Sequence, residues 1–282
     1  MTPGPTVHRI CRGGLTIRVL DWGGDGEPLL LLHPNGFCAG LFEPMARVLT
    51  GPYRPIAVDL RGHGGTGVPD DPEGLAWTEM AADAASVLDA LGVTEAVAVG
   101  QSLGGGVTVL LDRARPGLLR RALLCEAIAV PDVPDIARSN PLAEGARRRR
   151  AVWPDRASMV AAYSKRAPLS ELAPEALEAY VAWGTVERGD GTVELACRPE
   201  TEAALFEMAP TPVGGRGAWD HLADLSTEVV VLAGRSTSLP NEMFRWQAER
   251  AGVPLVLVEG GHFLLQEDTA RGAALVREHL GG

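Results

Sequence analysis

The sequence predicts an α/β fold, in which a mostly parallel sheet is covered by helices on both faces. Short apolar runs alternate with helical segments along residues 1–130 and again along residues 221–282. The connections between these segments are short, as they are in parallel sheets with crossover helices. The alternation stops over residues 131–220, which predicts an insertion into the core at that point.

The elements of the core follow from the apolar runs and from the residues that interrupt them. The first two strands are joined at Gly13-Gly14, a pair typical of a hairpin turn. The run Leu29–Leu32 has no polar residue, which is typical of a strand buried on both faces. Gly92 and Pro116 end two of the helices. We expect strands at 7–11, 15–21, 28–33, 54–59, 95–100, 119–125, 229–234 and 254–259, and helices at 40–49, 77–91, 103–115, 241–251 and 264–280.

The inserted segment, residues 131–220, contains no clear buried strand. It has helical patches at 142–152, 156–166 and 170–183, separated by prolines. We therefore interpret it as a helical cap over the sheet. The four arginines Arg147–Arg150 are expected to form a solvated helix face, and a gate for anionic substrates is the alternative.

Composition limits the classes of partner. The 282 residues carry a formal charge of −10, which disfavours nucleic acids and anionic membrane surfaces. No apolar run is long enough for a signal peptide or a membrane span. The four cysteines form no CxxC pair, so neither structural zinc nor a disulfide framework is indicated. We expect a cytoplasmic protein that acts on a small molecule without cofactor or metal, and we leave a homodimer open.

One motif points to covalent chemistry. Residues 100–104 read Gly-Gln-Ser-Leu-Gly, between an expected strand and an expected helix. This context is typical of a nucleophile elbow, which presents Ser102 on a strained turn where neighbouring glycines provide clearance. The start of the helix also directs backbone N–H groups at a developing oxyanion. The alternative is that Ser102 is an ordinary helix N-cap.

The chain resembles the α/β-hydrolase superfamily over nearly its whole length. The resemblance is carried, in the expected order, by HPNGF (33–37), DLRGHG (59–64), GQSLGG (100–105) and GGHF (260–263). It implies an eight-stranded, mostly parallel sheet with a cap inserted after the sixth strand. Ser102 argues against the dehalogenases and epoxide hydrolases of this superfamily, which use an aspartate nucleophile.

A serine nucleophile needs a base and an acid. The resemblance places the base at His262, after the last strand, and implies structural roles for His33 and His63. The usual acid position after the seventh strand has no carboxylate, because residues 233–240 read AGRSTSLP. Glu126, directly after the sixth strand, is our choice for the acid, since a buried carboxylate needs a partner. Glu242 is the alternative.

Two backbone N–H groups are needed for the oxyanion hole. Leu103, which follows the nucleophile, is expected to supply one of them. Pro34 has no N–H and cannot supply the other. We therefore assign the second donor to Asn35, and we keep Gly36 as an alternative donor.

Substrate specificity is expected to reside in the cap. Phe37 and Gly36 are expected beside the acyl group, and Trp153 and Trp183 in the cap. The other large apolar groups of the cap are Met159, Tyr163 and Trp219. Together with Ser102 and Glu126, the placement of Trp183 is similar to that in fungal zearalenone lactonases. The sequence thus favours a serine esterase or lactonase for a mid-sized apolar substrate. The alternatives are a carbon–carbon bond hydrolase, an acyltransferase or cyclase, and a ligand-binding protein without turnover.

Overall fold

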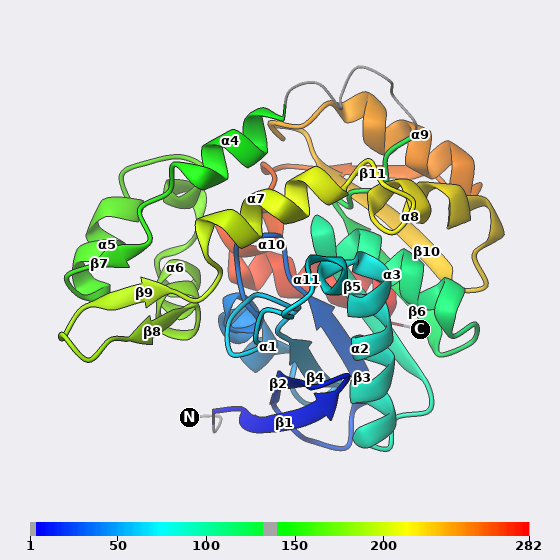
Figure 1. Cartoon of the computed structure of the whole chain (residues 1–282). Helices are drawn as coiled ribbons and strands as arrows, with labels where there is room; N and C mark the ends of the chain where they lie inside the picture. Colours follow the sequence, from blue (N-terminus) through cyan, green and yellow to red (C-terminus); the bar gives the residue numbers. More distant parts are fainter. Residues whose placement is uncertain (1–3, 132–139, 282) are drawn as a thin grey trace.

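The computed structural model describes residues 4–131 and 140–281. Its main sheet has eight strands in the order β1-β2-β4-β3-β5-β6-β10-β11 (Figure 1). β2 pairs antiparallel with β1 and with β4, and the remaining pairs are parallel. The strands are β1 (Thr6–Arg12), β2 (Leu15–Asp21), β3 (Glu27–Leu32), β4 (Tyr53–Val58), β5 (Ala96–Gln101), β6 (Leu119–Cys125), β10 (Glu228–Gly234) and β11 (Leu255–Val258). The predicted fold class is confirmed.

Helices cover both faces of this sheet. Along β3, Leu29 and Leu31 face one apolar layer and Leu30 and Leu32 face the other, as the twofold period of a strand requires. The first layer is closed by α1 (Glu43–Leu49), α10 (Leu264–Glu267) and α11 (Thr269–Leu280). The second is closed by α2 (Trp77–Ala90), α3 (Leu103–Ala114) and α9 (Asn241–Ala251).

Two expected helices of the core are divided. The helix expected at 40–49 is a 3₁₀ turn, η1 (Ala39–Phe42), followed by α1. The helix expected at 264–280 is α10 followed by α11, and Asp268 separates them. The Asp268 side chain accepts a hydrogen bond from Arg271 N at 2.9 Å. Aspartate is favoured at an N-cap and not within a helix, so α11 begins there.

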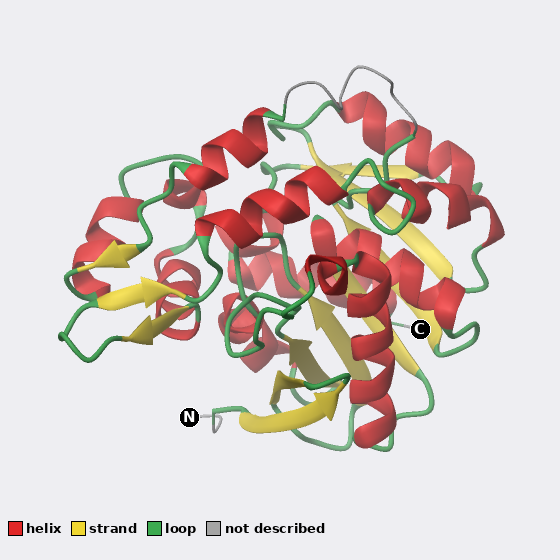
Figure 2. Ribbon diagram, viewed as in Figure 1, coloured by secondary structure: helices red, strands yellow, loops and turns green. Residues whose placement is uncertain are grey.

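The cap contains a small sheet that the sequence analysis did not predict. Strands β7 (Val152–Trp153), β9 (Val193–Leu195) and β8 (Thr185–Glu187) pair antiparallel in that order, apart from the main sheet (Figure 2). The expected helix at 142–152 therefore ends early, at Arg147. Strands of two or three residues are too short to show an alternating pattern. Within 131–220, residues 132–139 lie outside the described part of the chain.

The other elements of the cap are helical. They are the helices α4 (Pro141–Arg147), α5 (Arg156–Tyr163), α6 (Pro174–Trp183), α7 (Pro199–Met208) and α8 (Gly215–His221). The 3₁₀ turn η4 (Leu169–Glu171) lies between α5 and α6, and the turns η2 (Pro72–Leu75) and η5 (Leu222–Asp224) lie outside the cap. Figure 1 shows α4 and α7 lying across the upper end of the sheet. The strands β3 and β5 point toward that end, so the loops after them lie under the cap. This is the edge at which parallel sheets carry their ligands.

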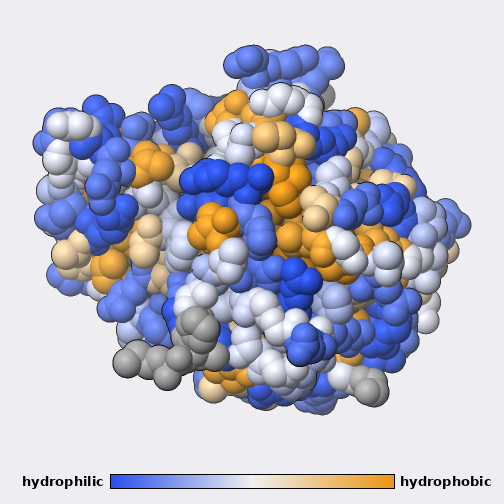
Figure 3. Space-filling model, turned by 90° about the horizontal axis from the view of Figure 1, so that it is seen from below, coloured by the Kyte–Doolittle hydropathy of each residue, from blue (hydrophilic) through white to orange (hydrophobic). Residues whose placement is uncertain are grey.

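The surface of the molecule carries both hydrophilic and hydrophobic side chains. Seen from below, it is mostly hydrophilic, with hydrophobic side chains gathered near the centre of that face (Figure 3). Within the described ranges, no helix combines the length and the apolar content needed to cross a bilayer.

Candidate active site

Ser102 lies at the sharp turn between β5 and α3. Its backbone φ is +54°, in the left-handed region that L-residues other than glycine rarely adopt. Neighbouring segments hold this conformation, because Ser102 N donates to Cys125 O and Ile128 N donates to Ser102 O, both at 3.0 Å. The Ser102 side chain makes no capping hydrogen bond to α3 in the described structure. This argues against the alternative that Ser102 is a plain N-cap.

The glycines around Ser102 provide steric clearance. A Cβ atom at Gly104 would collide with the carbonyl group of Leu32, and one at Gly100 would collide with the Thr108 side chain and the Gly104 carbonyl. Glycine at position 104 therefore lets the start of α3 approach β3, and glycine at position 100 lets α3 pack closely on β5.

His262 and Glu126 are in contact. His262 Nδ1 lies 3.0 Å from Glu126 Oε2, although 136 positions separate the two residues in the chain. Glu126 follows β6 directly, is fully buried and has a φ of +50°. Glu242, the alternative acid, is exposed in the first turn of α9. The structure thus brings Glu126 to the imidazole and leaves Glu242 at the surface.

The Glu126 carboxylate accepts two further hydrogen bonds. Gly234 N donates to Oε1 at 2.7 Å. The Thr237 hydroxyl donates to Oε2 at 2.6 Å, the same oxygen that contacts His262. A buried carboxylate is stable only when its oxygens are satisfied in this way. Both donors come from the end of β10 and the loop after it, where the superfamily usually has its acid.

Two buried glutamines hold the backbone of His262 through a chain of hydrogen bonds. Gln101 Nε2 donates to His262 O at 3.1 Å, and Gln266 Nε2 donates to Gln101 Oε1 at 2.8 Å.

In the described chain, the Ser102 hydroxyl and the His262 ring form no hydrogen bond with each other. Hydrogen bonds between catalytic groups often tighten only in the complex with substrate.

The loop after β3 approaches the start of α3 and carries Asn35. In the described structure, the backbone N–H groups of Asn35 and Leu103 are not used in hydrogen bonds within the protein. Gly36 N, in contrast, donates to His63 Nε2 at 3.0 Å. Gly36 therefore cannot supply the second oxyanion donor, and Asn35 remains the candidate.

His33 and His63 are fully buried, and their ring nitrogens bind backbone groups. Nδ1 of each ring contacts a carbonyl oxygen, that of Pro34 at 2.8 Å for His33 and that of Arg61 at 3.0 Å for His63. His33 Nε2 accepts from Leu60 N at 3.0 Å, as His63 Nε2 does from Gly36 N. These contacts assign a neutral ring protonated at Nδ1 to both residues. Burial lowers the pKa of His33 to about 4. Burial and the neighbouring His33 lower the pKa of His63 to about 3.

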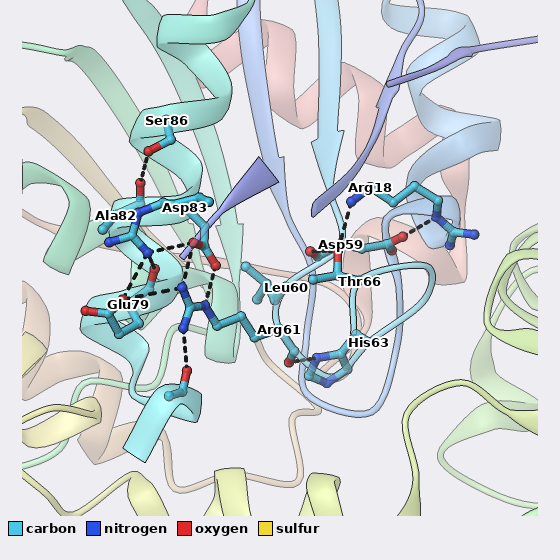
Figure 4. Close-up of polar contacts among 12 residues, drawn as sticks. Arg18, Asp59, Leu60, Arg61, His63, Thr66, Glu79, Ala82, Asp83 and Ser86 are labelled. Carbon is cyan, nitrogen blue, oxygen red and sulfur yellow. Dashed lines mark hydrogen bonds and ion pairs between the residues drawn. The ribbon is translucent and has the colours of Figure 1, made fainter. Parts of the chain in front are cut away.

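Ion pairs on either side hold the loop that carries His63 (Figure 4). The Arg18 guanidinium pairs with Asp59, and the Arg61 guanidinium pairs with Asp83 at 2.6 Å. Asp59 Oδ1 also accepts from Ala39 N at 2.8 Å, which fixes the start of η1. The two loops at this edge of the sheet are thus fixed to each other.

Phe37 and Trp153 belong to one apolar cluster that joins the core to the cap. The centre of the Phe37 ring lies 4.6 Å from the centre of the Tyr180 ring and 5.0 Å from that of the Phe263 ring. Phe263 in turn lies 5.0 Å from the His262 ring. Trp153 lies on the cap side of this cluster and donates Nε1–H to Arg150 O at 3.0 Å. Met159 and Tyr163 also belong to the cluster.

Trp183 packs against the same cluster from the end of α6, whereas Trp219 packs against the second apolar layer of the sheet. The assignment of Trp183 to substrate binding stays a prediction. The Trp183 indole packs against Gly40, where an added Cβ would overlap it, and its Nε1 donates to Glu43 at 2.6 Å. These contacts fix the end of α6 to the core. The guanidinium of Arg250 stacks over Trp219, with 5.1 Å between Arg250 Cζ and the centre of the ring.

The four-arginine run is not uniformly solvated, contrary to the expectation. Arg147, Arg148 and Arg150 are exposed, but Arg149 turns inward and pairs with the buried Glu202. Arg149 also donates to the Tyr180 hydroxyl at 2.9 Å. That hydroxyl donates to Gly36 O at 3.0 Å. A run of identical residues could not show which of them points into the protein.

Sequence reasoning missed the residues that support the site. Thr237 could have been suggested by the hydroxyl-rich stretch that stands where a carboxylate was expected. Gln101 and Gln266 are fully buried amides, and no local pattern connects them. Among the described residues, no three His, Cys, Asp or Glu side chains are grouped so that they could hold a metal ion.

The sequence profile of the alpha/beta hydrolase family matches residues 29–276. The chain belongs to this family. Among curated relatives, it is 37% identical over 131 residues to a non-heme chloroperoxidase of Streptomyces lividans, covering 45% of this chain and 46% of the relative. It is 35% identical over 109 residues to a putative carbamate hydrolase of Azorhizobium caulinodans, covering 39% and 40% of the two chains. The matches therefore span less than half of these relatives.

Solved structures agree with the family's fold over the whole chain. The structure of E-2-(acetamidomethylene)succinate hydrolase has a TM-score of 0.82 and 20% identity, and covers 99% of this chain and 100% of that one. An enol-lactonase of Burkholderia xenovorans LB400 has a TM-score of 0.74 and 18% identity, with 98% and 100% covered. At these identities the likeness establishes the fold of this alpha/beta hydrolase alone.

Proposed function

We propose that this alpha/beta hydrolase is a serine hydrolase that cleaves an ester or lactone of a mid-sized, largely apolar substrate. The observation that carries the proposal is the contact of 3.0 Å between His262 Nδ1 and Glu126 Oε2. It lies at the edge of the sheet where the strained turn presents Ser102. A nucleophile, a base and an acid that orients the base are the parts that acyl transfer requires.

The proposed mechanism assigns one step to each group. His262 takes the proton of the Ser102 hydroxyl as the serine oxygen attacks the substrate carbonyl, and Glu126 stabilises the imidazolium that forms. The N–H groups of Asn35 and Leu103 stabilise the oxyanion of the tetrahedral intermediate. The imidazolium then protonates the leaving alkoxide, which gives an acyl-enzyme. Water activated by His262 releases the acid and restores the serine.

The character of the substrate is proposed from the side chains beside His262. Phe263 and Phe37 lie next to it and continue into the apolar cluster of the cap. Binding sites lined by aromatic and aliphatic groups with few polar ones favour apolar ligands. We therefore place the acyl group of the substrate against Phe37.

Labelling with a fluorophosphonate probe tests the nucleophile without knowledge of the substrate. We expect the wild-type protein to be labelled and Ser102→Ala to remain unlabelled. Gly67→Ser, which adds a serine elsewhere, is a control for nonspecific reaction and should label as the wild type does. Equal labelling of the wild type and Ser102→Ala would remove Ser102 from its role.

A panel of p-nitrophenyl esters, macrolactones and β-diketones tests the substrate class. Turnover of the esters or lactones, with loss in Ser102→Ala, supports the proposal. Turnover of the diketones alone would favour carbon–carbon bond hydrolysis. Absence of any turnover, together with absence of probe labelling, would favour a ligand-binding protein.

A further inference from the structure

The loop after β10 contributes a hydroxyl group, and not a carboxylate, to the candidate active site. Thr237 Oγ1 lies 2.6 Å from Glu126 Oε2, and His262 Nδ1 lies 3.0 Å from the same oxygen. In many members of the superfamily this loop carries the acid itself. Here it supplies a donor to an acid that comes from another strand.

We infer that Thr237 is a positioning residue, which acts on His262 through Glu126. Glu126 is fully buried, and its side chain must direct one oxygen at the imidazole. Gly234 N holds Oε1 at 2.7 Å, and the Thr237 hydroxyl holds Oε2. With both oxygens held, the plane of the carboxylate is fixed. The inference rests on the proposed function, because it assigns no role to Thr237 unless Glu126 is the acid.

Thr237 is itself held in place for this purpose. Its oxygen accepts a hydrogen bond from Leu239 N at 3.3 Å. The hydroxyl proton therefore remains free to point at Glu126, which accepts and cannot donate when ionised. Hydrogen bonds to a charged acceptor are stronger than those between neutral groups, so this contact is suited to hold the carboxylate.

The hydroxyl also draws charge away from Oε2. Removing it concentrates negative charge on the oxygen that faces His262, which favours the protonated imidazole. Other ionisable groups near the pair include Cys125, whose thiol pKa burial raises well above its usual value, and Glu267, which accepts hydrogen bonds from Gly261 N. Glu171 and Arg271 lie beside the same glycine turn and act on Glu267. Among the described residues, none of these four forms a hydrogen bond with Thr237, so a substitution there changes the environment of Glu126 directly.

The test compares Thr237→Val, which has nearly the same shape but no hydroxyl, with Thr237→Ser, which retains the donor. The readout is the second-order rate of inactivation by a fluorophosphonate as a function of pH, and it needs no substrate. For Thr237→Val we expect a rate about tenfold to a hundredfold lower even at the pH optimum, because a carboxylate held at one oxygen only no longer directs the imidazole at Ser102. The factor corresponds to losing one hydrogen bond to a charged group. The acidic limb of the pH profile should also move to higher pH. Thr237→Ser should remain within about threefold of the wild type, because ordinary context effects are of that size.

A matched control is available in Thr269, whose hydroxyl donates to Glu175 Oε1 at 2.8 Å. Thr269→Val removes a similar threonine–glutamate contact away from Glu126. It should leave the rate and the pH profile unchanged. A common loss of rate in both valine variants, with no shift of the acidic limb, would show a general structural effect and overturn the inference.

The failure of the inference can be distinguished from that of the proposed function. If the probe labels Ser102 alone and Thr237→Val reacts at the wild-type rate with the wild-type pH profile, only the inference about Thr237 is wrong. If the probe labels Ser102→Ala as it labels the wild type, the proposed function itself is wrong.

Discussion

Glu126 and His262 contact each other through Oε2 and Nδ1 at 3.0 Å, and Glu126 is fully buried at the end of β6. Glu126 N is bound to Leu232 O of β10 at 2.8 Å, so the acid is fixed between two neighbouring strands of the sheet. The core of the sheet thus holds its backbone, while Gly234 of β10 and Thr237 of the following loop hold its carboxylate.

Glu126→Gln should reduce turnover of an ester substrate by about two to four orders of magnitude, by analogy with loss of the triad carboxylate in other serine hydrolases. The amide cannot stabilise the imidazolium, but it keeps nearly the same shape. Steady-state kinetics and circular dichroism measure the loss of turnover and the retention of fold. Glu242→Gln, at an exposed site, is the matched control. If Glu242→Gln loses activity and Glu126→Gln keeps it, the assignment of the acid is wrong.

Tyr180→Phe should lower kcat about tenfold with little change in KM. This is less than the roughly hundredfold or larger loss when an oxyanion donor itself is removed. The Tyr180 hydroxyl donates to Gly36 O at 3.0 Å and so holds the loop that carries Asn35. The control is Tyr163→Phe, which removes a hydroxyl 3.3 Å from Arg149. Equal kcat values in the two variants and the wild type would show that the contact with Gly36 has no effect on catalysis.

Trp183→Phe should destabilise the protein by about 1–2 kcal/mol, as expected for the loss of a hydrogen bond to a carboxylate, and should leave kcat unchanged. The lost bond joins the indole N–H to Glu43 at 2.6 Å. Urea unfolding and ester kinetics provide the two measurements. Trp246→Phe is the control, since Trp246 is 48% exposed. A change in KM without a change in stability would show instead that Trp183 contacts the substrate.

Acid should destabilise the fold through His33 and His63. Their pKa values in the folded protein, about 4 and about 3, lie below the value of 6.5 for a free histidine. Between pH 6.5 and about 4, the unfolded chain therefore binds protons that the folded chain cannot bind. Above pH 6.5, the two neutral histidines do not lower the free energy of unfolding. Below that pH, the free energy of unfolding falls as the pH drops, by up to about 1.4 kcal/mol per pH unit for each histidine.

Nuclear magnetic resonance of labelled histidines checks this pH dependence directly. The ring signals of His33 and His63, assigned by single substitution, should not titrate between pH 8 and pH 5. Urea unfolding over the same range should show the falling stability. A normal titration of either ring near pH 6.5 would contradict the neutral assignment.

The core was predictable from the sequence because its elements are long and periodic. The local sequence predicts the strand at Leu29–Leu32 and the turn around Ser102. It also predicts that Glu126 lies directly after β6. The pairing of Thr237 with Glu126 was not predictable in this way. It joins residues 111 positions apart, and a threonine in a loop has many other partners.

The cap was predicted less well for the same reason. Strand β7 has two residues, Val152–Trp153, and is defined only by its pairing with β9. The sequence shows that Trp183 is a large apolar residue, but its contact with Gly40 depends on how α6 packs against η1. The inward direction of Arg149 depends in turn on Glu202, which lies in α7.

The segment that leaves Glu126 for the cap is fastened at several points. Ile128 N donates to Ser102 O, Val130 N donates to Gly215 O, and Gln247 Nε2 binds the carbonyl groups of both Ala127 and Ala129. The bonds with Ser102 and Gln247 hold the segment directly after Glu126 to the core independently of the cap. The loop that carries Asn35 depends on the cap, because Tyr180 donates to Gly36 O. A covering segment of another shape, grafted at this junction to alter selectivity, must therefore retain that one contact.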